Sequence, residues 1–309
     1  MSCHVDISAI LTSMIPVATS EGVTVSCPRE GLYSFYNSPY PAHKLSTGID
    51  VYPDAGFGEV APSPVEGVVE LTRRVKAPRS RGFRDAGYDY VTLIRSSENP
   101  EKVVKLLHVE PTLTVGDSVK TGQDLGALLR SGYYGFSTSP HVHVEVRKPS
   151  DPLRARGGHT FRRLGGVDNL APITLLEGVV NRNLPEFTSV LLDGMAAPGL
   201  PADVGGVPGL LDGGIPYYGW LGAHTGAVRP VGETVRVMGV PVAMIDAVLD
   251  GACLASCLPF QVLANGAPTR GLSLRLSPRD EVVVKLIPMR YGGLEHEVDS
   301  SITIELRSI

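Results

Sequence analysis

The sequence has few charged side chains and no long run of one sign. Charged residues make up 19% of the 309 positions, and the formal net charge is −4. Proteins that bind nucleic acid usually carry a basic patch or stripe, so we expect no nucleic-acid partner. Apolar residues (43%) are sufficient for a folded core, and the high content of glycine (35) and proline (25) favours β-rich folds over helical bundles.

The sequence also lacks long hydrophobic runs. No window approaches the roughly 18 consecutive apolar residues that a membrane-spanning helix needs, so we expect no transmembrane segment. The N-terminal stretch MSCHVDISAILTSMIPVATSEG has no basic n-region and no sustained apolar core. It is therefore a poor secretory signal, and the sequence alone predicts a cytoplasmic protein that is not exported by the usual route.

Cysteine is sparse, and its spacing is not that of a metal site. The chain contains Cys3, Cys27, Cys253 and Cys257, and no Cys-x-x-Cys pair occurs. Cys253 and Cys257 would need two further ligands from elsewhere to hold zinc. We interpret them as buried free thiols, although the sequence leaves a disulfide open.

The stretch Pro140–Val146 (PHVHVEV) predicts a strand, because its polar and apolar residues alternate with period two. Residues i and i+2 of a strand point to the same face, roughly 6.5–7 Å apart. His141, His143 and Glu145 therefore share one face, while the valines can anchor a core. Two imidazoles on a rigid element suit a metal site, although a bare His-x-His is more often a pair of surface histidines.

Turn signals divide the chain into two β-rich parts. Short apolar runs between turns predict an antiparallel β-domain over residues 41–155. Residues 1–40 form a lead-in that we expect to pack on this domain, and the basic, glycine-rich residues 156–169 form a linker. Strand-like segments at sandwich spacing predict a β-rich accessory domain over residues 170–309. The expected fold class is therefore mainly β, with two domains in series.

Two stretches of the second part lack a clear strand pattern. Residues 196–216 are rich in glycine and proline, which predicts an irregular loop. The segment Met244–Ala255 fits either a strand or a helix. His224 and His296 stand alone there, so we expect no catalytic group in this part of the chain.

A second cluster of polar residues lies upstream of the His-x-His strand. His43 and Asp50 precede an alternating stretch, and His108 follows the apolar run Val103–Leu107. One carboxylate and two imidazoles would leave the fourth tetrahedral position of a zinc ion open, as in catalytic sites. Further histidines beside such a site can take a proton or stabilise an oxyanion.

Five segments, in order, resemble the LytM/lysostaphin-type zinc peptidases of the M23 peptidase family. Within about residues 41–152 they are His43…Gly48-Ile-Asp50, PSPVEGVVE, LLHVE, GDSVKTGQDLG and STSPHVHVEVR. The resemblance implies an antiparallel β barrel-sandwich hybrid (duplicated hybrid motif) fold. It also implies that Asp50 and His143 bind a Zn²⁺ cofactor and that His108 and His141 are the catalytic histidines.

The resemblance further implies an endopeptidase that cleaves glycine-rich or cell-wall-type peptides. Members of the family usually act outside the membrane, and a phage virion would deliver such a domain without a secretory signal. The oligomeric state is not indicated by the sequence.

The first metal ligand departs from the family pattern. The family usually has a histidine four residues before the aspartate, and Ser46 occupies that place here. Because a hydroxyl is a poor zinc ligand, we expect His43 to reach the metal instead, with Glu145 holding a ligand imidazole by a hydrogen bond.

Two other functions compete with the peptidase. The loss of a ligand at Ser46 would give a degenerate, non-catalytic member that retains the fold as a structural, peptide-binding or glycan-binding module. A biotinyl/lipoyl-type carrier shares the G-D-x-V-x-x-G-Q-x-x-G pattern, but it needs an exposed hairpin lysine, for which Val75-Lys76-Ala77 is a poor match.

Overall fold

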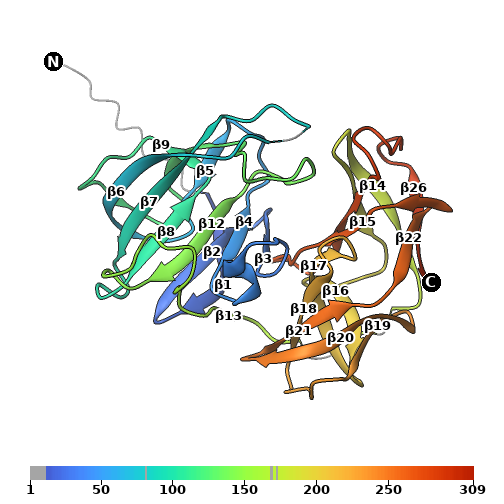
Figure 1. Ribbon diagram of the computed structural model, residues 1–309. Helices are drawn as coiled ribbons and strands as arrows, with labels where there is room; N and C mark the ends of the chain where they lie inside the picture. Colours follow the sequence, from blue (N-terminus) through green and yellow to red (C-terminus); the bar gives the residue numbers. More distant parts are fainter. Residues whose placement is uncertain (1–11, 81, 168–169, 172) are drawn as a thin grey trace.

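The structure is almost entirely β, as the composition predicted. The computed structural model describes residues 12–80, 82–167, 170–171 and 173–309 (Figure 1). In the described part, the one helix is α1 (Pro41–Lys44).

The first thirteen strands are β1 (Met14–Ser20), β2 (Val23–Pro28), β3 (Leu32–Ser34), β4 (Ile49–Tyr52), β5 (Val60–Pro62), β6 (Gly67–Lys76), β7 (Tyr88–Ser96), β8 (Val103–Leu107), β9 (Val109–Pro111), β10 (Ser118–Val119), β11 (Asp124–Leu128), β12 (Val142–Arg147) and β13 (Arg162–Arg163). The remaining strands are β14 (Leu176–Leu184), β15 (Phe187–Leu192), β16 (Leu200–Val204), β17 (Val207–Ile215), β18 (Trp220–Thr225), β19 (Thr234–Val237), β20 (Val240–Leu249), β21 (Ala252–Cys257), β22 (Phe260–Ala264), β23 (Ala267–Thr269), β24 (Gly271–Leu274), β25 (Val283–Ile287) and β26 (Ser301–Ser308).

Strands β1–β13 form the three sheets of the N-terminal unit, drawn in blue to green in Figure 1. An isolated bridge between Tyr33 of β3 and Leu276 joins this unit to the second one. The main sheet of the N-terminal unit has seven strands in the order β10-β6-β7-β8-β12-β4-β3, and two three-stranded sheets, β13-β1-β2 and β5-β11-β9, complete it. The short strand β13 lies within the segment expected as a linker and pairs with β1. The chain after residue 155 is therefore docked on this unit before it continues.

Strand β12 confirms the alternating pattern around the two histidines. It lies between β8 and β4 in the main sheet. Val142, Val144 and Val146 are fully buried in the core, so one face of the strand is anchored by apolar contacts. The other face carries His143 and Glu145, which are also buried.

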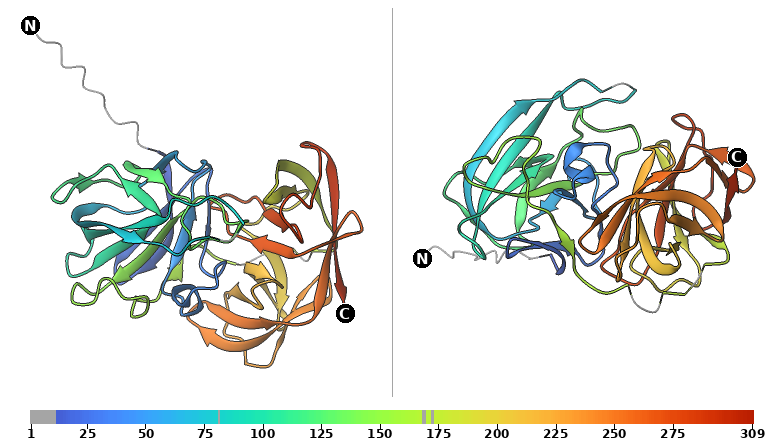
Figure 2. Two further views of the ribbon diagram at one scale, coloured as in Figure 1. Left: turned by 45° about the horizontal axis from the view of Figure 1, so that its top comes forward. Right: turned by 60° about the horizontal axis from the view of Figure 1, so that its bottom comes forward.

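The second unit contains β14–β26, drawn in yellow-green to red (Figures 1 and 2). Its strands form one continuous sheet of thirteen strands, in which an additional pairing between β16 and β17 closes six strands into a ring.

The prediction of an irregular loop over residues 196–216 was wrong. This segment forms the hairpin β16–β17, with Gly205 and Gly206 at positive φ in its turn. Glycines within the following strands make room for neighbouring groups: a Cβ on Gly222 would lie 1.9 Å from the Tyr36 ring.

The helical alternative for Met244–Ala255 was also wrong, since these residues belong to β20 and β21 and the turn between them.

The carrier hypothesis is not supported by the fold. Lys76 forms the last pair of the β6–β7 ladder, with Tyr88, and the connection from Lys76 to β7 is too long for a tight hairpin. No described residues form a helix with the length and hydropathy that a bilayer crossing requires.

Candidate metal centre

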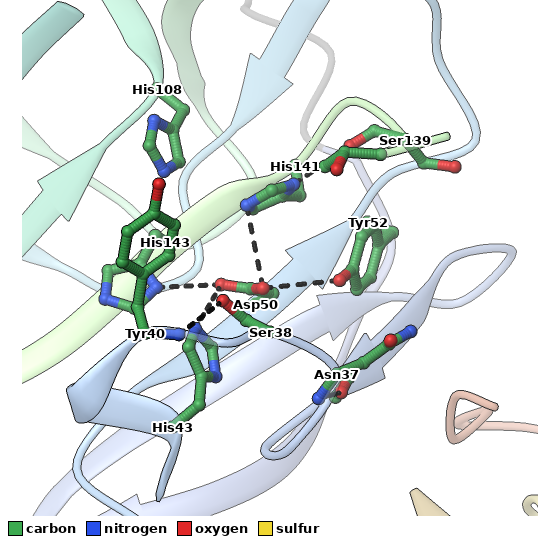
Figure 3. Close-up of polar contacts among 12 residues, drawn as sticks. Asn37, Ser38, Tyr40, His43, Asp50, Tyr52, His108, Ser139, His141 and His143 are labelled. Atoms are coloured by element: carbon green, nitrogen blue, oxygen red, sulfur yellow. Dashed lines mark hydrogen bonds and ion pairs between the residues drawn. The ribbon is translucent and has the colours of Figure 1, made fainter. Parts of the chain in front are cut away.

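Asp50 and His143 face each other across two neighbouring strands. The register of β4 and β12 places them directly opposite, and Nδ1 of His143 lies 2.8 Å from Oδ1 of Asp50 (Figure 3). Both side chains are buried. The pairing of two rigid strands therefore fixes two of the three residues expected to bind metal.

His43 joins this pair from the helix α1. Its Nε2 lies 3.3 Å from Oδ1 of Asp50, and the ligand atoms of His43, Asp50 and His143 all lie within 4.8 Å of one another. Ser46 points elsewhere: its hydroxyl makes a hydrogen bond of 2.9 Å with the Tyr36 hydroxyl. The helical turn after Tyr40 therefore brings His43 to the place that the sequence spacing left open.

The hydrogen bond of His43 to the backbone determines which nitrogen is free. Nδ1 lies 2.8 Å from the carbonyl oxygen of Phe35. A carbonyl only accepts, so Nδ1 of the neutral ring carries the proton and the Nε2 lone pair faces Asp50. Nε2 of His43 and Oδ1 of Asp50 are then both acceptors, and a cation between them would satisfy both. A set of two imidazoles and one carboxylate fits zinc.

The surroundings of Asp50 keep it ionised. Burial alone would raise the pKa of Asp50, but the nearby His141 and His43 and a hydrogen bond with His143 hold it well below its usual range. The Tyr52 hydroxyl also donates to Oδ2 of Asp50 over 3.3 Å. Burial alone would lower the pKa of His143, whereas its bonds with Asp50 and Glu145 raise it to about 9.

His141 lies next to the three candidate ligands without being part of their set. Its Nδ1 donates to the carbonyl oxygen of Ser139 over 2.9 Å, and its Nε2 lies 3.6 Å from Oδ2 of Asp50 (Figure 3). Burial lowers the pKa of His141 to about 4, although Asp50 opposes this shift. The ring is therefore neutral at pH 7, with Nε2 available as a proton acceptor.

His108 forms a dyad with Asp89, a residue that the sequence analysis missed. Asp89 accepts hydrogen bonds from the backbone N–H of His108 (2.9 Å) and from its Nδ1 (2.6 Å). His108 has a positive φ of 71°, a conformation that is uncommon for residues other than glycine and that occurs at functional sites. Asp89 shares one face of β7 with the buried Val91 and Leu93, and the local sequence does not mark it as the partner of His108.

Tyr134 is a second residue that the sequence analysis missed. Its ring stacks on His141 with centroids 4.8 Å apart and lies at the same distance from His108. Its buried hydroxyl has no hydrogen-bond partner among the described residues. Tyr134 is one of two adjacent tyrosines in a glycine- and serine-rich loop, and no pattern there would have identified it.

Glu145 is buried and belongs to a charged network beside His143. Its Oε1 lies 3.3 Å from Nε2 of His143 and accepts from Lys105 Nζ at 2.6 Å, while its Oε2 accepts from Arg147 at 3.0 Å. Burial would raise the pKa of Glu145, but His143 and Lys105 lower it to about 2. The Glu145 carboxylate therefore contacts Nε2 of His143, whereas Nδ1 of the same ring faces Asp50.

All these groups line one cavity of about 440 Å³. Its wall includes the three candidate ligands together with His108, His141 and Tyr134. This volume is in the range of small-molecule and peptide side-chain pockets. The arrangement can bind a cation and, beside it, accept and donate protons at two further imidazoles.

Comparisons with known families cover both units. Residues 24–163 match the domain of unknown function DUF8155 N-terminal domain, and residues 186–307 match the DUF8155 C-terminal domain. The two domains of this family therefore follow one another in the chain. A search of curated proteins finds no match.

Two solved structures are similar to parts of the chain. One is a mutant catalytic domain of the prophage-encoded M23 protein EnpA from Enterococcus faecalis, with 25% identity over 42% of this chain and 88% of that chain, and a TM-score of 0.27. The other is Csd3 from Helicobacter pylori, with 22% identity over 51% of this chain and 36% of that chain, and a TM-score of 0.25. TM-scores this low carry no argument about function, so any inference about function rests on the geometry of the site.

Proposed function

We propose that this protein is a zinc-dependent endopeptidase. One observation carries the proposal: the ligand atoms of His43, Asp50 and His143 converge within 4.8 Å of one another, beside two histidines that are not needed to hold a metal. Three protein ligands leave an open coordination position, as catalytic zinc sites do. Ser46 in the place of the family's first ligand favoured a degenerate module. That argument is weaker now, because His43 approaches Asp50 from α1.

The chain's own residues would divide the work of hydrolysis. Zinc held by His43, Asp50 and His143 would supply a Lewis acid that polarises the scissile carbonyl and lowers the pKa of a water toward about 7. His141 would accept the proton of the attacking water at its free Nε2.

His108 would stabilise the negative charge that develops on the carbonyl oxygen. Asp89 keeps a hydrogen bond to Nδ1 of His108 and would stabilise positive charge on the ring when a proton sits at Nε2. From Nε2, His108 would donate to the carbonyl oxygen as it becomes negative, and later to the leaving amine.

The substrate class comes from the resemblance to the M23 peptidases. We propose that the protein cleaves glycine-rich or cell-wall-type peptides, and that it acts outside the cell membrane or as part of a virion.

Loss of either non-ligand histidine tests the proposal. We expect His108→Ala and His141→Ala each to retain zinc but to lose peptide hydrolysis by about 10²-fold or more, the usual effect of removing a positioned acid, base or oxyanion group. The assay uses glycine-rich and cell-wall-type peptides, with zinc content measured on the same samples. His159→Ala, a histidine outside the cavity, is the matched control and should retain activity. If fully zinc-loaded wild-type protein cleaves none of the panel but binds some of it, the protein is a binding module and the proposal fails.

A further inference from the structure

A second cavity, of about 400 Å³, lies between the two units. The N-terminal unit contributes the segment after β4 and the residues just before His141, and the second unit contributes the ends of β14 and β15 and the segment after β24. Tyr52 and Thr138 line both this cavity and the candidate metal centre. The two cavities therefore share part of a wall, but their remaining lining differs.

Most of the charge on the wall of this inter-unit cavity is already neutralised. Three of its arginines are paired with carboxylates that also line it: Arg130 with Glu186 at 3.1 Å, Arg182 with Asp54 at 3.3 Å, and Arg279 with Glu30. These pairs are partly exposed and contribute little net charge to the cavity.

Arg275 is the arginine of this wall that forms no ion pair with a carboxylate among the described residues. It is 7% exposed, and its Nε has no hydrogen-bond partner among the described residues. Its guanidinium lies 5.0 Å from the centre of the Tyr52 ring, which supports the cation but gives its Nε–H no acceptor. A buried guanidinium without an acceptor is strongly unfavourable, so the site is built for a group that supplies one.

A neighbouring lysine, Lys285, lies close enough to respond to the charge of Arg275. Lys285 is buried and donates to the carbonyl oxygen of Ser137 at 2.6 Å and to the Ser139 hydroxyl at 2.9 Å. Burial, together with the nearby Arg275, lowers the pKa of Lys285 well below its usual range. No ion pair joins either cation to a carboxylate among the residues that the structure describes.

We propose that the inter-unit cavity binds an organic monocarboxylate whose carboxylate group pairs with Arg275. A planar guanidinium matches a carboxylate through two parallel hydrogen bonds. Because the other three arginines of the wall are already paired, Arg275 offers a single uncompensated positive charge, which matches a monoanion better than a dianion such as phosphate. The apolar side chains of Phe57, Leu184 and Phe187 would contact the body of the ligand.

Two sources of such a group fit the cavity: a free aliphatic acid and the C-terminus of a short peptide. Isothermal titration of the full chain with hexanoate, with N-acetyl-alanyl-alanine and with the C-terminal amide of that dipeptide distinguishes them. We expect at least one of the two carboxylates to bind in the millimolar range or tighter and the amide not to bind. Inorganic phosphate should bind at least about 10-fold more weakly than that carboxylate.

The substitution Arg275→Gln should weaken carboxylate binding by about 10-fold or more. The same variant should melt at the wild-type temperature or above it when no ligand is present, because it removes an unpaired buried charge; a merely structural arginine would give a lower melting temperature. Arg182→Gln, at a paired and more exposed arginine of the same wall, is the matched control and should bind as the wild type does.

Several results would overturn the proposal. They are no carboxylate binding to the wild type, equal binding of acid and amide, tighter binding of phosphate, or full binding by Arg275→Gln. Carboxylate binding that survives in Arg275→Gln but is lost in His143→Ala would place the ligand at the metal centre instead. Should Arg275→Gln fail to fold, Arg275→Lys retains the charge without the planar fork, and unchanged binding by that variant would also contradict the proposal.

Discussion

At the scale of single residues, the site depends on which ring nitrogen each histidine leaves free. Backbone carbonyl oxygens of Phe35 and Ser139 accept from Nδ1 of His43 and His141, so their Nε2 atoms face Asp50. For His143 the order is reversed: Glu145 holds Nε2, and Nδ1 faces Asp50. Partners of this kind fix the tautomer and orientation of a ligand imidazole.

The carboxylate of Glu145 should therefore contribute to metal affinity without binding the metal. We predict that Glu145→Gln lowers zinc affinity by about 10–100-fold, the usual effect of losing such a hydrogen-bonded partner. Competition with a chromogenic chelator measures the zinc Kd. Asp151→Asn is a matched control, since Asp151 also pairs with Arg147 but lies far less buried and has no ion pair with His143 among the described residues. An unchanged Kd for Glu145→Gln would show that its role is confined to neutralising Lys105 and Arg147.

The sequence predicted residues of the site only where a short motif carried them. Asp50, His108, His141 and His143 lie in such motifs, and the structure brings all four to one cavity. His43 was also expected to reach the metal, although the spacing did not predict the helical turn α1 that carries it. Asp89 was hidden because a carboxylate within an apolar strand face has no signature until its partner, His108, is placed beside it.

At the scale of secondary-structure elements, the approach of α1 and β4 to β12 fixes the distance between ligands. Gly48 lies immediately before β4, where a Cβ would be 2.7 Å from Cε1 of His143 and 3.1 Å from the Cβ of Ala42. A glycine is therefore needed here for space.

We predict that Gly48→Ala displaces the His143 ring and lowers zinc affinity by about 10-fold or more, because ligand atoms must lie within about 0.2 Å of their coordination distances. Gly135→Ala is the control: Gly135 lines the same cavity, but its nearest contact would be an ordinary 3.7 Å, to Thr138. Circular dichroism and the chelator assay separate loss of fold from loss of metal. A Gly48→Ala protein with wild-type zinc affinity would contradict the proposed ligand geometry.

Strands with clear alternation were predictable, and glycine-rich strands were not. The Val-rich β12 has the period-two pattern in its sequence, although all six of its residues are buried because the polar face is covered as well. The hairpin β16–β17 was mistaken for a loop because its glycines serve close packing between strands, and local sequence does not distinguish such glycines from those of turns.

At the scale of the whole molecule, the second unit supports both sides of the candidate metal centre. Asp212 of β17 accepts from the Ser34 hydroxyl at 2.5 Å and from the Phe35 N–H at 2.6 Å, and the Phe35 carbonyl in turn holds His43. On the other side, Lys285 of β25 holds Ser139, whose carbonyl holds His141. Figure 2 shows the two units side by side in both views.

Asp212 should therefore affect zinc binding from the second unit. We predict that Asp212→Asn lowers the zinc affinity by about 10-fold, and that it reduces stability by about 1.5–3 kcal/mol, the contribution of a hydrogen bond to a charged group. Asp203→Asn, which alters a turn of the same unit, is the control and should change neither quantity much. A lower melting temperature with an unchanged zinc Kd would show that Asp212 only holds the units together.

The sequence alone did not predict these contacts between the two units. Asp212 and Phe35 are 177 positions apart, and Lys285 and Ser139 are 146 apart. No local pattern relates residues at such separations, so the second unit could be predicted as β-rich but not as a support for the site.

Zinc content is the most direct test of the metal centre. Elemental analysis of protein purified without chelator, and again after reconstitution, should give about one zinc per chain for the wild type and for His159→Ala. His143→Ala should give almost none, because a three-ligand site cannot spare a ligand. Wild-type protein that takes up no zinc, or a His143→Ala protein that retains it fully, would contradict the assignment of His43, Asp50 and His143 as ligands.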